Sequence, residues 1–334
     1  MRADRPFSPT ADGCAWITIG AIALVVAGFV WLGAFAADGR SFLLPLAVAA
    51  LLAAGGGYYR LIRCEARLGA MLCGTAEIVG FAAVAGPLSY LAAAAGFPLQ
   101  DAVLEAWDRR LGIDWSGMVN FVALRPGLQL ALLFAYSSFA LQTVTTVLVL
   151  GLAGQLARLG HFIHAFMATT LVIIAISAIS PAAGPWLYLD LQPGAANGFL
   201  PVSSSSWPVF LALRDGSLRT VYGLNTEGII TFPSLHAALG VLFAAALWRV
   251  KKIRWIALLL NGLLLMATPA YGSHYVTDVL AGIAVAAVSW IALAPRFDPA
   301  SEPQPEQFSA LEDRASIVPE AALPQSDHGS LAKV

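Results

Sequence analysis

Four residues in two short segments of the sequence have side chains suited to acting on a phosphate group. The first segment holds Ser234 and, two residues later, His236; the second holds His274 and, four residues later, Asp278. Residues four apart share one face of a helix, so Asp278 can hold the His274 imidazole in one tautomer and stabilise its cation. This pattern predicts that His274 is a nucleophile and that His236 gives or takes a proton.

The residues before His236 are typical of a helix start that binds an anion. Pro233 suits the first helical turn, since its missing N–H would be unpaired there anyway. The free N–H groups of that turn and the helix dipole favour phosphate, and the Ser234 hydroxyl adds a donor. Two other interpretations stay open at this point: ordinary interfacial histidines with satisfied hydrogen bonds, and a zinc site formed by His236, His274 and Asp278.

The composition indicates that these residues are positioned by membrane helices. Of the 334 residues, 58% are hydrophobic and 12% are charged, about half the charged fraction of a soluble domain. Many apolar runs reach the ~20 residues that a bilayer core requires. We therefore expect an all-α, polytopic membrane protein with about eight transmembrane helices, near 15–37, 41–62, 69–96, 128–154, 160–182, 232–249, 254–271 and 275–294.

The distribution of basic residues predicts the orientation of these helices. With the N-terminus in the cytoplasm, 13 of the 19 lysines and arginines lie on the cytoplasmic side, including the cluster at 249–254. Both termini are then cytoplasmic, and the helices that begin near His236 and His274 both start at the outer face. We expect a multi-pass protein of a bacterial inner (plasma) membrane with an extracytoplasmic site. The net charge of −1 and the lack of a basic stripe predict no nucleic-acid partner.

Two long connections, 97–127 and 183–231, face outward in this topology. The first predicts a helix in the plane of the interface, with one apolar and one charged face: Leu99, Val103, Ala106, Trp107 and Leu111 against Asp101, Glu105, Asp108 and Arg109. The second predicts a short helix between Ser206 and Gly216, whose apolar side chains could rest on the membrane. Structural packing and substrate gating both remain open as roles for these helices.

The segments around both histidines resemble sequence motifs of a known family. Pro233–His236 and Gly272–Asp278 resemble the second and third motifs of the type-2 phosphatidic acid phosphatase (PAP2) superfamily. The leucine before His236 and the His-Tyr-x-x-Asp form are most similar to the inositol phosphorylceramide synthase (inositolphosphotransferase) branch. Ser180–Trp186 resembles the proline-rich segment that this branch carries at the first-motif position. The order of the three segments agrees with that of the family.

The resemblance implies a division of the chain and a reaction. Residues 67–296 would form a PAP2-like six-helix catalytic core, preceded by a cytoplasmic segment, 1–14, and two extra transmembrane helices in 15–66. The tail, 297–334, is rich in Pro, Glu, Ser and Gln, and we expect it to be disordered and cytoplasmic. The family's known mechanism needs no metal and no other cofactor.

The resemblance also implies roles for the candidate residues. His274 would attack phosphorus and form a phosphohistidine, Asp278 would orient His274, and His236 would protonate the leaving oxygen. An alcohol would then accept the phosphoryl group, or water would release phosphate. The substrate would be a membrane lipid phosphate or phospho-head-group, while protein partners stay open. The alternatives are a plain lipid phosphate phosphatase (phosphatidate or polyprenyl diphosphate type) and a non-catalytic membrane protein or transporter of the same fold.

The sequence departs from the phosphatase pattern in its cations. The phosphatases' first motif has a lysine and an arginine, but Ser180–Trp186 has no cation, and Thr268 stands where their third motif has an arginine. A phosphoryl group needs cationic or other strong donors. We expect Arg219, and next Arg214, to bind the substrate phosphate together with Ser234. The departure favours a lipid phosphotransferase over a plain phosphatase.

Overall fold

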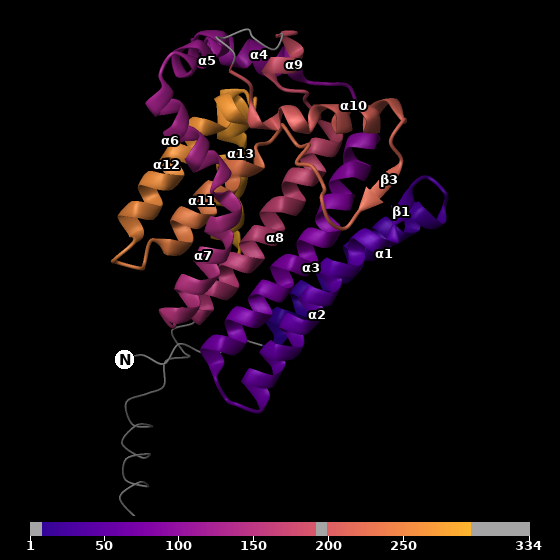
Figure 1. Cartoon of the computed structure of the whole chain (residues 1–334), viewed down its shortest axis with the longest axis vertical. Coiled ribbons are helices and arrows are strands. Elements are labelled where there is room, and N and C mark those ends of the chain that lie inside the picture. The colour runs from indigo at the N-terminus through magenta and orange to yellow at the C-terminus, as the bar shows by residue number, and fades with distance from the viewer. Residues whose placement is uncertain (1–8, 192–198, 295–334) are drawn as a thin grey trace, which may run out of the picture. The chain divides into compact units, whose positions relative to one another are not determined.

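The computed structural model describes residues 9–191 and 199–294, and almost all of its regular structure is helical (Figure 1). The elements in chain order are α1 (Pro9–Trp31), β1 (Ala36–Asp38), α2 (Gly39–Leu61), α3 (Ala66–Ala94), α4 (Asp101–Arg110), α5 (Trp115–Ala123), α6 (Pro126–Ser137), α7 (Phe139–Leu152), α8 (Leu156–Ile179), α9 (Pro185–Tyr188), η1 (Val202–Ser205), α10 (Trp207–Asp215), β3 (Thr220–Tyr222), α11 (Leu235–Leu247), α12 (Arg254–Tyr271) and α13 (Val276–Ala292). The expected tail, 297–334, and most of the segment 1–14 lie outside the described residues.

A helix occurs in each of the eight ranges expected to cross the membrane. Among the described residues, five helices are long and apolar enough to span it: α1, α2, α3, α8 and α12. Counting the bent pair of α5 and α6 as one span raises the number to six, and α7, α11 and α13 are apolar but shorter. The chain is an all-α, multi-pass membrane protein, which confirms the expected fold class.

The first span ends earlier than its apolar run suggested. The predicted helix extended to residue 37, but α1 stops at Trp31. The segment that follows is β1, which pairs in parallel with β3, with Ala36 opposite Thr220. The positive φ of Gly33, +72°, allows the chain to turn between the helix and the strand. An alanine-rich run cannot distinguish these two conformations, because only its distant partner makes it a strand.

The expected fourth span, 128–154, is divided into α6 and α7. The break falls at Ser138, whose hydroxyl donates to the Ala135 carbonyl (2.7 Å) and accepts from Gln142 Nε2 (2.9 Å). Local bonds of this kind replace part of the helical ladder and are a recognised cause of kinks. A second bend, of 109°, separates α5 from α6. The break at Ser138 was not expected, since the span was predicted as one helix, whereas the bend before α6 lies in the predicted connection 97–127.

Both helices expected in the long connections are present. The structure confirms α4, whose apolar side chains Val103 and Trp107 are exposed from the protein. It also confirms α10, which ends at Gly216 in the left-handed conformation (φ +85°). The idea that the apolar side chains of α10 rest on the membrane is wrong for Phe210 and Leu213, because both are buried against the helix bundle.

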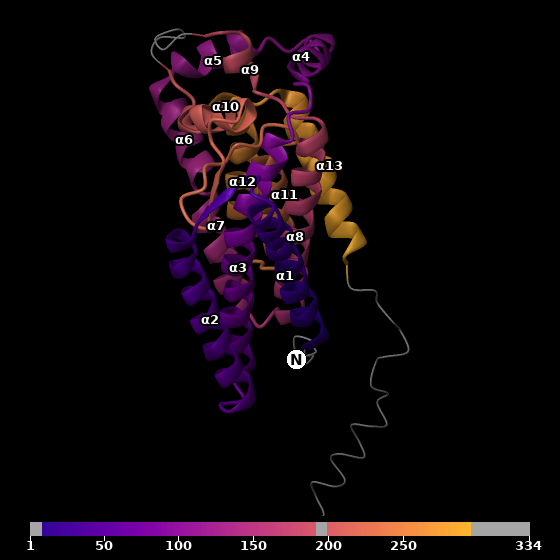
Figure 2. The ribbon, with the colours of Figure 1, turned by 90° about the vertical axis from the view of Figure 1, so that its right-hand side faces the viewer.

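The helices pack so that the starts of α11 and α13 lie side by side. The Ser234 N–H donates to the Asp278 carbonyl oxygen over 3.1 Å, which joins the two helix starts directly. Helix α11 also packs on α12, α7 and α8, while α3 packs on α2, α8 and α1. Figures 1 and 2 show α4, α5, α9 and α10 gathered at one end of this bundle, opposite the α2–α3 turn. The fold therefore brings both histidine segments to the covered end.

Candidate active site

Ser234 marks the exact start of the helix that carries His236. It is the N-cap of α11, and its hydroxyl accepts the Ala237 N–H over 3.4 Å. Pro233 lies just before this cap and not in the first turn, which corrects the expected helix start at 232. The Ser234 hydroxyl also lies 3.4 Å from His274 Nε2. The N-cap of one helix is thus in contact with the predicted nucleophile of the other segment.

His274 and Asp278 form a buried pair. His274 Nδ1 lies 3.3 Å from Asp278 Oδ2, with side chains 4% and 0% exposed. The same carboxylate oxygen accepts the Tyr275 N–H over 2.9 Å, as Asp278 occupies the third position of α13 and caps its start. This backbone bond fixes the carboxylate against the imidazole. With Nδ1 turned to Asp278, Nε2 is the nitrogen left to face Ser234.

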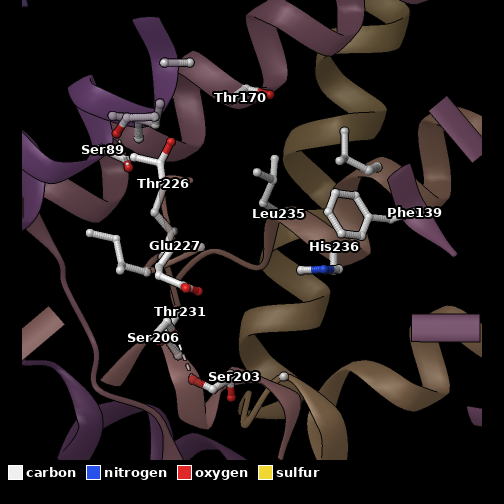
Figure 3. A pocket seen from close by; sticks show the side chains of 18 of the residues that line it. Ser89, Phe139, Thr170, Ser203, Ser206, Thr226, Glu227, Thr231, Leu235 and His236 are labelled. Carbon is white, nitrogen blue, oxygen red and sulfur yellow. Dashed lines mark hydrogen bonds between the residues drawn. The ribbon is translucent and has the colours of Figure 1, made fainter. Parts of the chain in front are cut away.

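His236 lies between two aromatic rings. Its imidazole stacks on Tyr136 (centroids 4.3 Å apart, planes at 14°) and meets Phe139 edge-on (4.8 Å, 71°). These aromatic residues flank the break between α6 and α7, so the break places both rings on the same histidine; Figure 3 shows Phe139 beside His236. Sequence reasoning missed both residues, because they read as ordinary apolar positions of one long span.

One cavity adjoins both histidines. Its volume is about 340 Å³, and His236 and His274 are among its lining residues. Apolar side chains from α3 and α8 form much of its lining, namely Phe81, Ala82, Ala85, Phe166 and Ile174. Hydroxyl groups lie on the same two helices, at Ser89 and Thr170, and the segments 203–206 and 226–231 add Ser203, Ser206, Thr226, Thr231 and one carboxylate, Glu227 (Figure 3). The cavity therefore offers both apolar surface and hydrogen-bonding groups to a bound molecule.

The structure brings four of the six predicted site residues together and keeps the two arginines apart from them. Arg214 Nη2 donates to the Phe97 carbonyl over 2.8 Å, and the Arg219 guanidinium lies 5.2 Å from the Phe35 ring centre. Neither arginine lines the cavity, and no lysine or arginine does so in the part of the chain that the structure describes. The predicted binding of the substrate phosphate by these arginines therefore needs a test with arginine variants.

Thr268 offers no replacement for the missing cation. Its side chain is fully buried within α12, and its hydroxyl donates to the Leu264 carbonyl over 2.8 Å. The zinc interpretation also finds no support, since no group of three or more His, Cys, Asp or Glu side chains is placed to hold a metal ion within residues 9–191 and 199–294. Within the described residues, the donor in contact with His274 Nε2 is the Ser234 hydroxyl, 3.4 Å away.

The segment expected at the first-motif position packs directly against the second histidine segment. The Trp186 N–H donates to the Ser273 hydroxyl over 3.0 Å. Gly184 has a φ of +94°, and a side chain there would strike the Ser273 carbonyl oxygen. Only glycine allows this close approach. The proline-rich segment thus packs against the His274 segment, although it contributes no charge. We refer to residues 183–186 and 273–277 together as the frame of His274.

Two further residues hold this frame, and sequence reasoning missed them. Asp101 accepts N–H groups from Ala183 and Gly184, and Asp108 accepts one from Val276. Both were assigned to the charged outer face of the predicted interfacial helix. Their spacing of seven, which places them on one helical face, was the available signal. Their partners lie more than 80 residues away and could not be identified from sequence.

Comparisons with known proteins identify the family of the chain. The family model described as the PAP2 superfamily matches residues 102–292. A curated relative, Phosphoinositol dihydroceramide synthase of Bacteroides thetaiotaomicron, is 29% identical over 141 residues, which cover 39% of this chain and 44% of the relative. The chain thus spans less than half the length of that relative. No solved structure matches the chain.

Proposed function

The chain belongs to the PAP2 superfamily, and from this premise we propose that it is a membrane-embedded lipid phosphotransferase that works through a phosphohistidine. The observation that carries the proposal is the buried His274–Asp278 pair with Nε2 turned toward Ser234 beside the cavity. A nucleophilic imidazole needs its other nitrogen held by an acceptor, and Asp278 is that acceptor.

The proposed reaction has two steps that reuse the same groups. In the first, His274 Nε2 attacks the substrate phosphorus, the bond from phosphorus to the leaving oxygen breaks, and His236 gives that oxygen a proton. In the second, an alcohol oxygen attacks the phosphohistidine, its proton passes to His236, and the N–P bond breaks. Asp278 stabilises the cationic ring of the intermediate. Water in place of the alcohol gives free phosphate instead.

The cavity supports a lipid substrate with a polar head. Its apolar side chains suit hydrocarbon, and its hydroxyl groups suit a head group. We propose that the phosphoryl group lies at the start of α11, whose first residues Leu235 and His236 line the cavity and whose helix dipole favours an anion. Ser234 lies buried behind this turn, against His274. This placement also supports a catalytic core of 67–296, because α3 lines the cavity although it precedes the family match at residue 102.

We propose transfer to an alcohol over plain hydrolysis. Glu227, the one carboxylate among the lining residues in the described chain, can accept a hydrogen bond from the hydroxyl group of an acceptor alcohol. The name of the Bacteroides relative, a synthase, favours the same outcome. Hydrolysis of a lipid phosphate is the second candidate function, because the first half of the reaction is shared.

We propose that the site faces the outside of a bacterial plasma membrane, with both termini in the cytoplasm, as the basic residues indicate. Labelling of single cysteines in intact cells tests this orientation, in a chain whose native cysteines are replaced. Asp215→Cys should react with an impermeant maleimide, and Lys251→Cys should react only after the membrane is permeabilised. The opposite pattern would place the site in the cytoplasm.

The function is tested with purified protein in lipid and phospholipids labelled in the head-group phosphate. We expect the wild type and the His164→Ala variant to form a labelled transfer product. The His274→Ala variant should form none. His164 is a matched control, since its ring nitrogen Nδ1 pairs with the Gly160 carbonyl of its own helix, away from the cavity. Release of labelled phosphate alone would favour the phosphatase. Equal inactivity of all three proteins on every lipid would favour the non-catalytic or transporter alternatives.

A further inference from the structure

Helix α4 contacts the catalytic frame through its acidic side chains. In an ordinary amphipathic helix the apolar face packs on the protein and the charged face is solvated. In α4 two carboxylates share the buried face with one apolar residue, because Asp101, Leu104 and Asp108 are each only 2% exposed while Val103 and Trp107 are 46% and 49% exposed. Burying a carboxylate is costly unless strong hydrogen bonds compensate. The partners of these carboxylates therefore explain why α4 is oriented this way.

Asp101 holds the segment that precedes α9. Its carboxylate accepts the Ala183 N–H (2.9 Å) and the Gly184 N–H (2.8 Å), and the Gln100 N–H donates to the Pro181 carbonyl (2.9 Å). Backbone N–H groups bound to a carboxylate form charge-assisted bonds, which are stronger than neutral ones. Gly184 packs against Ser273, the residue before His274. By binding the Gly184 N–H, Asp101 therefore holds one side of the His274 loop, residues 273–275.

Asp108 holds the other side of that loop. Its two oxygens accept the Val276 N–H (2.7 Å) and the Thr277 N–H (2.9 Å), which belong to the first turn of α13. A carboxylate is favoured there by the free N–H groups and by the helix dipole. The two amides lie between His274 and Asp278 in the chain. Any shift of this turn changes the geometry of the histidine–aspartate pair.

Tyr275 joins Asp101 to the His274–Asp278 pair. Its hydroxyl donates to Asp101 Oδ1 over 3.2 Å, and its N–H donates to Asp278 Oδ2 over 2.9 Å. The ring is 1% exposed, so it is fixed on all sides. A continuous chain of hydrogen bonds thus runs from α4 to the carboxylate that orients His274.

We propose that Asp101 and Asp108 are positioning residues of the reaction, which hold the His274 loop from both sides in its reactive geometry. This inference rests on the proposed function. A misplacement of about 1 Å in a reacting group can lower a rate about 100-fold. The arrangement also has a consequence for the substrate: since Asp108 occupies the amides that begin α13, the phosphoryl group is left with the start of α11, beside Ser234.

The matched variants are Asp108→Asn and Asp101→Asn, with Glu105→Gln as the control on the same helix. Glu105 pairs with Arg109 over 2.6 Å and accepts no N–H from either segment of the frame. With each protein in lipid, we would measure kcat and KM for the labelled phospholipid, the single-turnover rate of phosphohistidine formation, and the melting temperature. Tyr275→Phe removes the hydroxyl link alone and serves if an aspartate variant does not fold.

We expect both asparagine variants to lower kcat and the rate of phosphohistidine formation by about 10- to 100-fold, with KM within threefold of wild type, and Tyr275→Phe to show a smaller loss. A role in stability alone would lower the melting temperature and leave the kcat of the folded fraction unchanged. Activities equal to that of Glu105→Gln in folded protein would overturn the inference and leave the proposed function intact.

Binding of inorganic vanadate provides a test that does not depend on turnover. Vanadate adopts the five-coordinate geometry of phosphoryl transfer, so its affinity reports how well His274 is positioned. We expect Asp108→Asn and Asp101→Asn to weaken vanadate binding about tenfold or more relative to Glu105→Gln. If the wild type turns over no lipid, the proposed function fails; unchanged or absent vanadate binding across the whole series would overturn the positioning role as well.

Discussion

Replacing Asp278 by asparagine isolates the charge that the proposed mechanism requires. The asparagine oxygen can still accept the Tyr275 N–H that Asp278 Oδ2 accepts at 2.9 Å, so the start of α13 is preserved. What is lost is the negative charge beside the His274 ring, 3.3 Å away at the closest atoms. Two unit charges centred about 4 Å apart interact by about 4 kcal/mol at an effective dielectric constant of ~20.

That energy sets the expected size of the effect. If the charge acts on the cationic ring that forms as His274 attacks phosphorus, its loss raises the barrier by about 4 kcal/mol, or about 1,000-fold in rate. The solvent does not reduce this value much, since both side chains are buried. We therefore expect Asp278→Asn to form the phosphohistidine about 1,000 times more slowly than wild type in a single-turnover experiment, with nearly unchanged lipid KM.

The assay is rapid-quench detection of acid-labile, base-stable label on the protein after mixing with head-group-labelled lipid. The melting temperature of the variant serves as the control for folding. A loss of less than tenfold in well-folded Asp278→Asn would refute the reasoning, because it would mean that the charge does not act on His274 during the attack.

Three further predictions follow from the contacts of individual residues. Ser234→Ala should lower the free energy of unfolding by about 1 kcal/mol through loss of an N-cap, measured as a lower melting temperature, and should slow phosphohistidine formation. An unchanged melting temperature with an unchanged rate of phosphohistidine formation would remove Ser234 from the site. Glu227→Gln should raise the KM for the acceptor alcohol by about 10-fold, because it weakens one charged hydrogen bond, and should leave single-turnover phosphohistidine formation near wild type. An unchanged acceptor KM would contradict the proposed contact between Glu227 and the alcohol. Arg219→Ala and Arg214→Ala should change the lipid KM by less than threefold, because both guanidinium groups lie outside the cavity lining; a rise of about 10- to 100-fold would show instead that they bind the phosphate, as the sequence suggested.

The sequence was sufficient for the features that depend on local patterns. Long apolar runs identify membrane helices without any knowledge of their partners, and a helix was found in every expected range. The spacing of four between His274 and Asp278 suggested a contact on one helix face, and the contact is present. It has a different cause, because His274 precedes the N-cap Tyr275 and the pair meets across the start of α13. The family resemblance, confirmed by the match over residues 102–292, rested on equally local motifs.

Features set by distant partners were missed or misplaced. The strand at Ala36–Asp38 exists because it pairs with β3, and nothing within the strand itself marks it. Tyr136 lies in an apolar run, and its contact with His236 depends on the break at Ser138. Asp101 has the composition of a solvated helix face, and only the fold brings backbone amides to it.

The cations expected near a phosphoryl group illustrate the same limit. The side of the membrane and the place of Arg219 in the chain predict that it binds the phosphate. Its guanidinium lies against Phe35, and its carbonyl accepts the Ala36 N–H next to the β1–β3 pairing, which no local pattern revealed. In the proposed mechanism the start of α11, with Ser234 beside His274, takes the role that arginines have in the phosphatases. The division into 15–66 and 67–296 likewise stays a prediction.

The proposed mechanism requires His274 to carry the phosphoryl group, and that group can be located on the protein. Wild-type protein in lipid would be quenched at alkaline pH during turnover of head-group-labelled phospholipid, digested, and analysed by mass spectrometry. We expect one phosphoryl group, on His274, absent from His274→Ala and discharged when an acceptor alcohol is added. Continued transfer of label with His274 unmodified, or with the phosphoryl group on another residue, would contradict the mechanism.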